Sequence, residues 1–113
     1  MGKGLLNYDA VLAQLLQSYA DDMNRSNTGI NAKVVIDRER GHYQLLNNGW
    51  RDGKYYFYVV FHFDLIDDKI WIQENRTDVL IAEELQELGV PKKDIVLGLQ
   101  APEVRDYYGY AVG

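Results

Sequence analysis

One long run of residues constrains the fold of this chain more than any other feature. The segment 54–66 reads KYYFYVVFHFDLI, and successive side chains of such a strand point to opposite faces of a sheet. The face expected in the core carries Tyr55, Phe57, Val59, Phe61, Phe63 and Leu65. The opposite face carries Tyr56, Tyr58, Val60, His62, Asp64 and Ile66. The run therefore predicts a long strand with one apolar face and one mixed face.

The next strand is joined to this run by a short turn at residues 67–68. If this turn is a two-residue loop, Leu65 pairs with Ile70 and Phe63 with Ile72, which keeps apolar residues together. The pattern therefore predicts an antiparallel hairpin from this run into the segment that begins at Lys69.

The preceding turn, at residues 51–53, leaves two registers open. A three-residue loop with glycine in the left-handed position is one choice, and a two-residue Asp-Gly loop is the other. The first places Tyr43 and Leu45 on the core face, whereas the second places Gln44 and Asn48 there. We prefer the three-residue loop because it buries fewer unpaired amides.

The chain also contains two helix patterns. Apolar residues at helical spacing predict an amphipathic helix over about 7–24, followed by a strand over about 30–38. The apolar stripe of this first helix comprises Leu5, Tyr8, Leu12, Leu15, Leu16, Tyr19 and Met23. Thr77 is expected to cap a second helix that begins at Asp78, and Gly89 to end it. The inner stripe of that helix comprises Ile81, Ala82, Leu85 and Leu88.

These elements define the expected architecture. We predict a two-layer α+β protein with a four-stranded antiparallel meander sheet, an N-terminal helix and a second helix after the fourth strand. Residues 95–97 can add a short extra strand. The length of 113 residues fits one domain over 1–113.

Charge and composition narrow the function classes. The net charge is −5 and no basic stripe is present, so direct DNA binding is not expected. There are no cysteines, which excludes disulfides and thiolate metal sites. No stretch approaches the roughly 20 apolar residues of a membrane span, and no secretory signal is recognised, so we expect a cytoplasmic protein without membrane contact.

Two helices can cover only one face of the predicted sheet, so the other face is the expected site of function. In the predicted pairing Asp64 lies beside Trp71 and His62 beside Gln73. The candidate interaction residues are Tyr56, Tyr58, His62, Asp64, Trp71, Gln73 and Asn75. Aromatic residues among polar ones are typical of protein interfaces. The alternative is that the tyrosine-rich C-terminal tail folds over this face.

The same face also carries the side chains that a metal site or a catalytic site would need. The preferred register places His42 across from His62 and Arg40 across from Asp64, so two imidazoles and a carboxylate could converge on a metal. Exposed strand histidines beside tyrosine are the more usual outcome, and we predict no metal and no cofactor. No serine lies in a nucleophile motif, and no glycine spacing fits a phosphate loop. We predict no catalytic residues, and a small metal-dependent or acid-base enzyme using His42, His62 and Asp64 is the alternative.

Several short motifs follow one another in a fixed order along the chain. They are DRER at 37–40, HYQL at 42–45, GW at 49–50, HFD at 62–64, KIWIQ at 69–73, IAEEL at 81–85, GVP at 89–91 and DIVLG at 94–98. In this order they resemble the XisI family of small cyanobacterial proteins, described as fdxN element excision controlling factors. The match extends from Leu5 to Val112. In the tail, residues 105–110 lack a threonine that the family pattern would have, so tail-specific contacts are not carried over.

The resemblance implies a noncatalytic accessory role in programmed DNA rearrangement during heterocyst differentiation. A site-specific recombinase excises the element, and the implied partners are a companion protein of the XisH type and, indirectly, that recombinase. The family has no assigned catalytic residues. A homo-oligomer is a further expected partner. Because the family occurs in multiple copies per genome, a paralogue with another regulatory role is an alternative.

Overall fold

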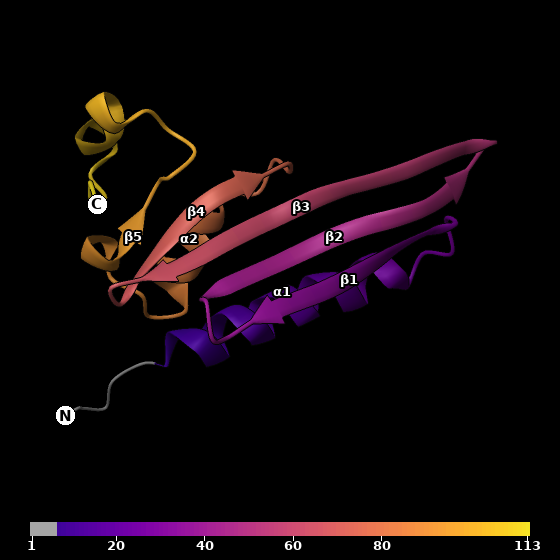
Figure 1. Cartoon of the computed structure of the whole chain (residues 1–113), viewed down its shortest axis with the longest axis horizontal. Helices are drawn as coiled ribbons and strands as arrows, with labels where there is room; N and C mark the ends of the chain where they lie inside the picture. The colour runs from indigo at the N-terminus through magenta and orange to yellow at the C-terminus, as the bar shows by residue number, and fades with distance from the viewer. Residues whose placement is uncertain (1–6) are drawn as a thin grey trace.

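The computed structural model describes residues 7–113, which form two layers (Figure 1). The helices are α1 (Tyr8–Asn24) and α2 (Ile81–Glu87), with short 3-10 helices η1 (Lys92–Asp94) and η2 (Pro102–Tyr108). The strands are β1 (Ile30–Asp37), β2 (His42–Arg51), β3 (Lys54–Ile66), β4 (Lys69–Asn75) and β5 (Ile95–Val96). Within these residues the strands form one sheet in sequence order, and both α-helices lie behind it in the view of Figure 1.

The α+β class is confirmed, but the four-stranded antiparallel meander is wrong. Strands β1 to β4 pair antiparallel as expected, and β5 then adds a parallel edge to β4. Ile95 and Val96 of β5 have no exposed surface, so burial against the core fixes this strand beside β4. It corresponds to the short extra strand predicted at 95–97.

Helix α1 matches the helix predicted over 7–24. Asn7 caps it, because its Oδ1 accepts the N–H of Ala10 over 3.2 Å. Leu12, Leu16 and Ala20 recur every four residues and are buried against the sheet. Burying each leucine contributes about 1.5–3 kcal/mol, which holds the helix on this face. Leu5, also predicted in the stripe, lies outside the described residues.

The loop between β2 and β3 is the two-residue one, so the preferred three-residue loop is wrong. Arg51 pairs with Lys54, and only Asp52 and Gly53 lie between them. Their φ angles are 51° and 76°. An Asp-Gly pair takes these left-handed angles readily, and such loops match the twist of a hairpin.

A β-bulge in β3 places Tyr43 and Leu45 in the core, although the loop is shorter than the one from which this placement was predicted. Leu45 pairs with Phe61 and Leu46 with Val59, so Val60 is an extra residue. Beyond the bulge, Tyr43 and Leu45 lie on the core face, as predicted, and are almost completely buried.

The same bulge exchanges the faces of β3 on the side of the loop. Tyr55 and Phe57, predicted in the core, are 47% and 65% exposed. Tyr58, predicted on the open face, lies opposite Asn47 and packs against the core. Tyr56, two residues before Tyr58 in the strand, lies on the same helix side of the sheet. A one-residue shift reverses a whole strand segment, which is why the sequence assignment of these faces is wrong.

The hairpin of β3 and β4 follows the prediction until a second irregularity. Leu65 pairs with Ile70 and Phe63 with Ile72, around the two-residue loop at residues 67–68. His62 then pairs with Glu74 rather than lying beside Gln73, because Gln73 is the extra residue.

Helix α2 begins at Ile81, later than predicted, and Thr77 does not cap it. Thr77 is held instead by Asn75, whose Oδ1 accepts its N–H over 2.9 Å and its hydroxyl over 2.7 Å. Only Ile81 and Leu85 of the predicted stripe are buried, since Leu88 is 47% exposed. The stop at residues 89–91 forms as expected, with Gly89 at φ 103°.

Candidate functional site

The open face of the sheet, opposite the helices, is the candidate site. Alternation and the observed register assign its residues on the three central strands. They are His42, Gln44, Leu46, Asn48 and Trp50 of β2, Tyr55, Phe57, Val59, His62 and Asp64 of β3, and Trp71 of β4. Apolar side chains gather at the end of this face formed by the β2–β3 hairpin, and polar side chains gather toward the opposite end of these two strands, around the pair His42 and Asp64.

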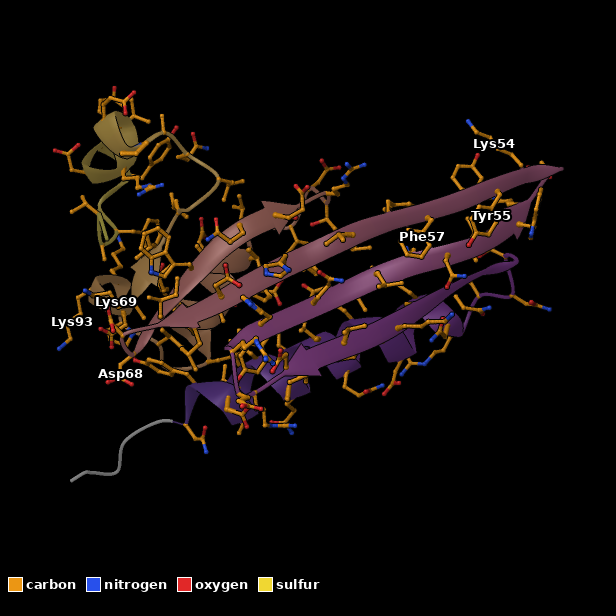
Figure 2. The ribbon with its side chains drawn as sticks, in the orientation of Figure 1. Lys54, Tyr55, Phe57, Asp68, Lys69 and Lys93 are labelled. Atoms are coloured by element: carbon orange, nitrogen blue, oxygen red, sulfur yellow. The ribbon has the colours of Figure 1, made fainter. Side chains whose placement is uncertain are left out.

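The apolar end is a hairpin patch formed by Trp50, Tyr55 and Phe57. Trp50 is 64% exposed, and its ring lies 5.2 Å from that of Tyr55. Figure 2 shows Tyr55 and Phe57 in the half of the β2–β3 hairpin that leads to its tip, where β2 and β3 continue beyond the end of β4. Grouped exposed aromatic side chains mark interaction surfaces, whereas single ones do not.

The charged residues at the tip of this hairpin face away from the patch. Arg51 and Lys54 follow Trp50 and precede Tyr55, so alternation turns their side chains to the helix side of the sheet. There Lys54 Nζ lies 5.3 Å from the centre of the Tyr56 ring, and Arg51 Nε lies 3.9 Å from a carboxylate oxygen of Asp52. The patch on the open face is therefore purely aromatic.

The polar part of the open face contains a His–Asp cluster formed by His42, His62 and Asp64. Asp64 Oδ1 lies 2.6 Å from His42 Nδ1 and 2.7 Å from His62 Nε2. Gln73 Nε2 donates to the second oxygen, Oδ2, over 3.2 Å, and Gln44 Oε1 lies 2.9 Å from His62 Nδ1. The predicted convergence of the three residues is present, but through a different register, since His42 pairs with Asp64.

The environment of Asp64 favours its charged form. Partial burial raises the pKa of its carboxyl, but the hydrogen bonds from His42 and His62, and then Gln73, outweigh burial and hold this pKa below its usual value. The carboxyl therefore stays ionised at neutral pH and offers negative charge to the two imidazoles.

The C-terminal tail covers one border of the open face and leaves the hairpin patch uncovered. The guanidinium of Arg105 lies 5.1 Å from the centre of the Trp71 ring. Lys69 Nζ donates to the carbonyl of Gly113 over 3.1 Å, which fastens the end of the chain beside β4. The predicted covering by the tail therefore applies only to the β4 side.

Three of the predicted interaction residues lie elsewhere. Tyr56 and Tyr58 are on the helix side, where Asn47 Nδ2 donates to the Tyr58 hydroxyl over 3.1 Å. Asn75 pairs with Phe61 and orders the turn before α2. The other four, His62, Asp64, Trp71 and Gln73, do lie on the open face or contact it. Sequence reasoning missed Trp50 and assigned Tyr55 and Phe57 to the core, because strict alternation along β3 does not allow for the bulge at Val60.

The fold and the open face define a class: a small two-layer α+β protein that keeps much of one sheet face free of its own helices. No helix within residues 7–113 is long and apolar enough to cross a bilayer.

Comparison with known proteins gives the family. The profile of the XisI family, described as XisI protein, matches residues 1–112, so this chain belongs to the XisI family. The crystal structure of a XisI-like protein from Anabaena variabilis matches with a TM-score of 0.87 and 45% identity, covering 94% of this chain and 96% of that chain. The fdxN element excision controlling factor XisI from the same organism matches with a TM-score of 0.79 and 27% identity, with the same coverage. No curated protein matches this chain.

Proposed function

We propose that this protein is a noncatalytic accessory factor that controls excision of a DNA element by contacting other proteins through its open face. Membership of the XisI family supports the process, because one structural relative is an excision controlling factor. The hairpin patch supports the mode of action. It is the observation that carries the proposal, since exposing Trp50, Tyr55 and Phe57 together is costly for a protein that has nothing to bind.

The proposed partner is a protein rather than DNA. Binding to DNA relies on neutralising phosphates with lysine and arginine, and a chain with net charge −5 is poorly suited to it. A companion protein of the XisH type, and through it a recombinase, fits the family resemblance. The patch would suit a partner with an apolar pocket, because its three exposed members are all aromatic.

The expected energetics follow from burial. Trp50 and Phe57 are each about two-thirds exposed, so a partner can remove much of their apolar surface from water. Central aromatic residues of an interface typically contribute about 2 kcal/mol or more each. Replacing both should therefore weaken binding by about three orders of magnitude, with little effect on folding.

A complementation experiment tests this function. In a cell whose resident XisI protein has been replaced by this chain, the wild type should support excision of the fdxN element. The double variant Trp50→Ser with Phe57→Ser should not support it. A matched control is Tyr107→Ser, which removes an aromatic ring that is 88% exposed on η2, away from the patch. Excision at the wild-type level in the double variant would contradict the proposed face, and failure of the wild type would contradict the proposed process.

A further inference from the structure

The His–Asp cluster has a chemistry that contact with a protein partner does not require. His42 Nδ1, His62 Nε2 and a carboxylate oxygen of Asp64 all lie within 4.8 Å of one another. We propose that His42, His62 and Asp64 are the ligands of a binding site for a divalent transition-metal ion of the zinc type. This departs from the sequence-based prediction of no metal, and it stands independently of the role in excision.

The first argument is the orientation of His62. A neutral imidazole has a hydrogen on one nitrogen and a lone pair on the other. The carbonyl oxygen of Gln44 lies 2.9 Å from Nδ1 and is placed to accept its hydrogen, which leaves Nε2, the nitrogen that faces Asp64, as the one to bind a metal. Metal-binding histidines are commonly held in this way, by donation from the second ring nitrogen to a carbonyl or carboxylate.

The second argument is the electrostatics of the centre. His62 Nε2 lies 2.7 Å and His42 Nδ1 lies 2.6 Å from the same carboxylate oxygen, Oδ1 of Asp64. Contacts this short need a proton between the nitrogen and the oxygen, and a metal ion can take the place of those protons. Gln73 holds the other carboxylate oxygen, so the carboxylate is oriented as well. The cluster is therefore built to hold positive charge, either as protons or as a metal ion.

The third argument is the size of the movement that a metal needs. Zinc lies about 2.0–2.2 Å from nitrogen and oxygen ligands, which places tetrahedral ligands about 3.4 Å apart. The contacts of 2.6 and 2.7 Å would have to lengthen by about 0.8 Å, and the two imidazole nitrogens, which lie within 4.8 Å of each other, would have to come to about the same 3.4 Å. The side chain of His42 is 50% exposed, so its rotation can supply this adjustment without disturbing the core. Its exposure also leaves room for water or a partner's side chain as a further ligand.

The ligand types select the class of metal. Two imidazoles with one carboxylate suit zinc, nickel, cobalt or copper ions. Magnesium and calcium prefer all-oxygen sites, which one carboxylate does not supply. The chain contains only two histidines, both in this cluster, so any histidine-dependent binding must occur here.

Calorimetric titration of the full chain, without a histidine tag, with zinc chloride at pH 7.5 tests the site. We expect one ion per chain, and His62→Gln and Asp64→Asn should each lower the affinity by more than about 100-fold. Gln44→Leu removes no ligand but frees the His62 ring, and should lower the affinity about tenfold. Glu74→Gln is the matched control, because Glu74 pairs with His62 in the sheet without belonging to the cluster. It should change the affinity less than threefold.

Two further arms separate a zinc site from a proton-binding cluster. Magnesium and calcium should not bind, and zinc affinity should fall between pH 7.5 and 5.5, because protons compete for the same nitrogens. Circular dichroism of each variant verifies folding, and His42→Gln replaces any variant that unfolds. No zinc binding by the wild type, or equal affinity in the folded His62→Gln and Asp64→Asn variants, would overturn the proposal and leave a cluster that holds only protons.

Discussion

Removing a single hydroxyl group should weaken the attachment of α1 to the sheet. Tyr43 of β2 is 2% exposed, and its hydroxyl donates to Asp9 Oδ1 of α1 over 2.7 Å. Arg38 Nε lies 2.8 Å from the same oxygen. A hydrogen bond to a charged group contributes about 1.5–3 kcal/mol. Since the Asp9 side chain is 32% exposed, we expect Tyr43→Phe to cost about 1.5–2 kcal/mol, the lower part of that range.

The pH dependence of stability tests the same contact through both of its titrating groups, Tyr43 and Asp9. Burial, and then the hydrogen bond to Asp9, raise the pKa of Tyr43 to about 12. The hydroxyl therefore contributes stability below about pH 10, which is lost as the pH rises through 12. The hydrogen bond from Tyr43 is the main cause that lowers the pKa of Asp9. That carboxyl contributes stability above about pH 4, which is lost as the pH falls through the lowered pKa.

Urea unfolding at pH 3, 7 and 11 measures both effects. The free energy of unfolding of Tyr43→Phe should be about 1.5–2 kcal/mol lower than wild type at pH 7, with a melting temperature about 6–8 °C lower. The difference should shrink at pH 3, because the pH is then falling from the ordinary pKa of an aspartate toward the lowered pKa of Asp9, and also at pH 11, because the pH is then rising toward the raised pKa of Tyr43. Tyr107→Phe is the control, because that ring is 88% exposed and should change nothing. A loss below about 0.5 kcal/mol at pH 7 would mean that the contact between Tyr43 and Asp9 does not hold α1 on the sheet.

Three other changes test the account. Deleting one valine of the pair at 59–60 should leave a folded protein that is about 1.5–3 kcal/mol less stable by urea unfolding, because it removes the bulge residue and keeps every other pairing; an unfolded product would count against the bulge. Asn75→Ala should cost about 1–3 kcal/mol in the same assay, because three hydrogen bonds order the turn before α2, and a neutral result would show that the turn forms without them. Phe57→Ser should leave the melting temperature within about 2 °C of wild type, since this ring is 65% exposed; a larger drop would mean that the ring stabilises the fold.

Local signals in the sequence predicted much of the fold because several of them allow only one solution. The helical spacing of the apolar residues fixes α1, and the two-residue loop at 67–68 fixes the register between β3 and β4. The pairs Leu65 with Ile70 and Phe63 with Ile72 follow from it. Each of these signals depends only on residues close together in the chain.

The faces of β3 could not be predicted because two departures compensate each other. The loop at 51–53 is one residue shorter than expected, which shifts the pairing of β2 with β3 by one residue. The bulge at Val60 shifts the pairing back, so the expected core residues still face the helices. Val59 and Val60 are both apolar, so the sequence carries no sign of an extra residue. Only packing against the helices, which depends on contacts far apart in the sequence, determines that Phe61 and Phe63 are inside while Phe57 is outside.

The same one-residue shift explains why the sequence predicted only part of the candidate site. The shift moves His42 from opposite His62 to opposite Asp64, and since these two are neighbours on one face, all three still meet. The hairpin patch was missed because strict alternation assigned Phe57 and Tyr55 to the core. Its discovery needs the exposed area of each ring, which alternation does not supply.

The affinity of this protein for a companion of the XisH type tests the central claim most directly. Purified wild type, the double variant Trp50→Ser with Phe57→Ser, and the control Tyr107→Ser should be compared by calorimetry or surface plasmon resonance at one salt concentration. We predict binding by the wild type and the control, and a loss of about 1,000-fold in the folded double variant. Equal affinity in all three proteins would contradict the claim that the open face is the interface.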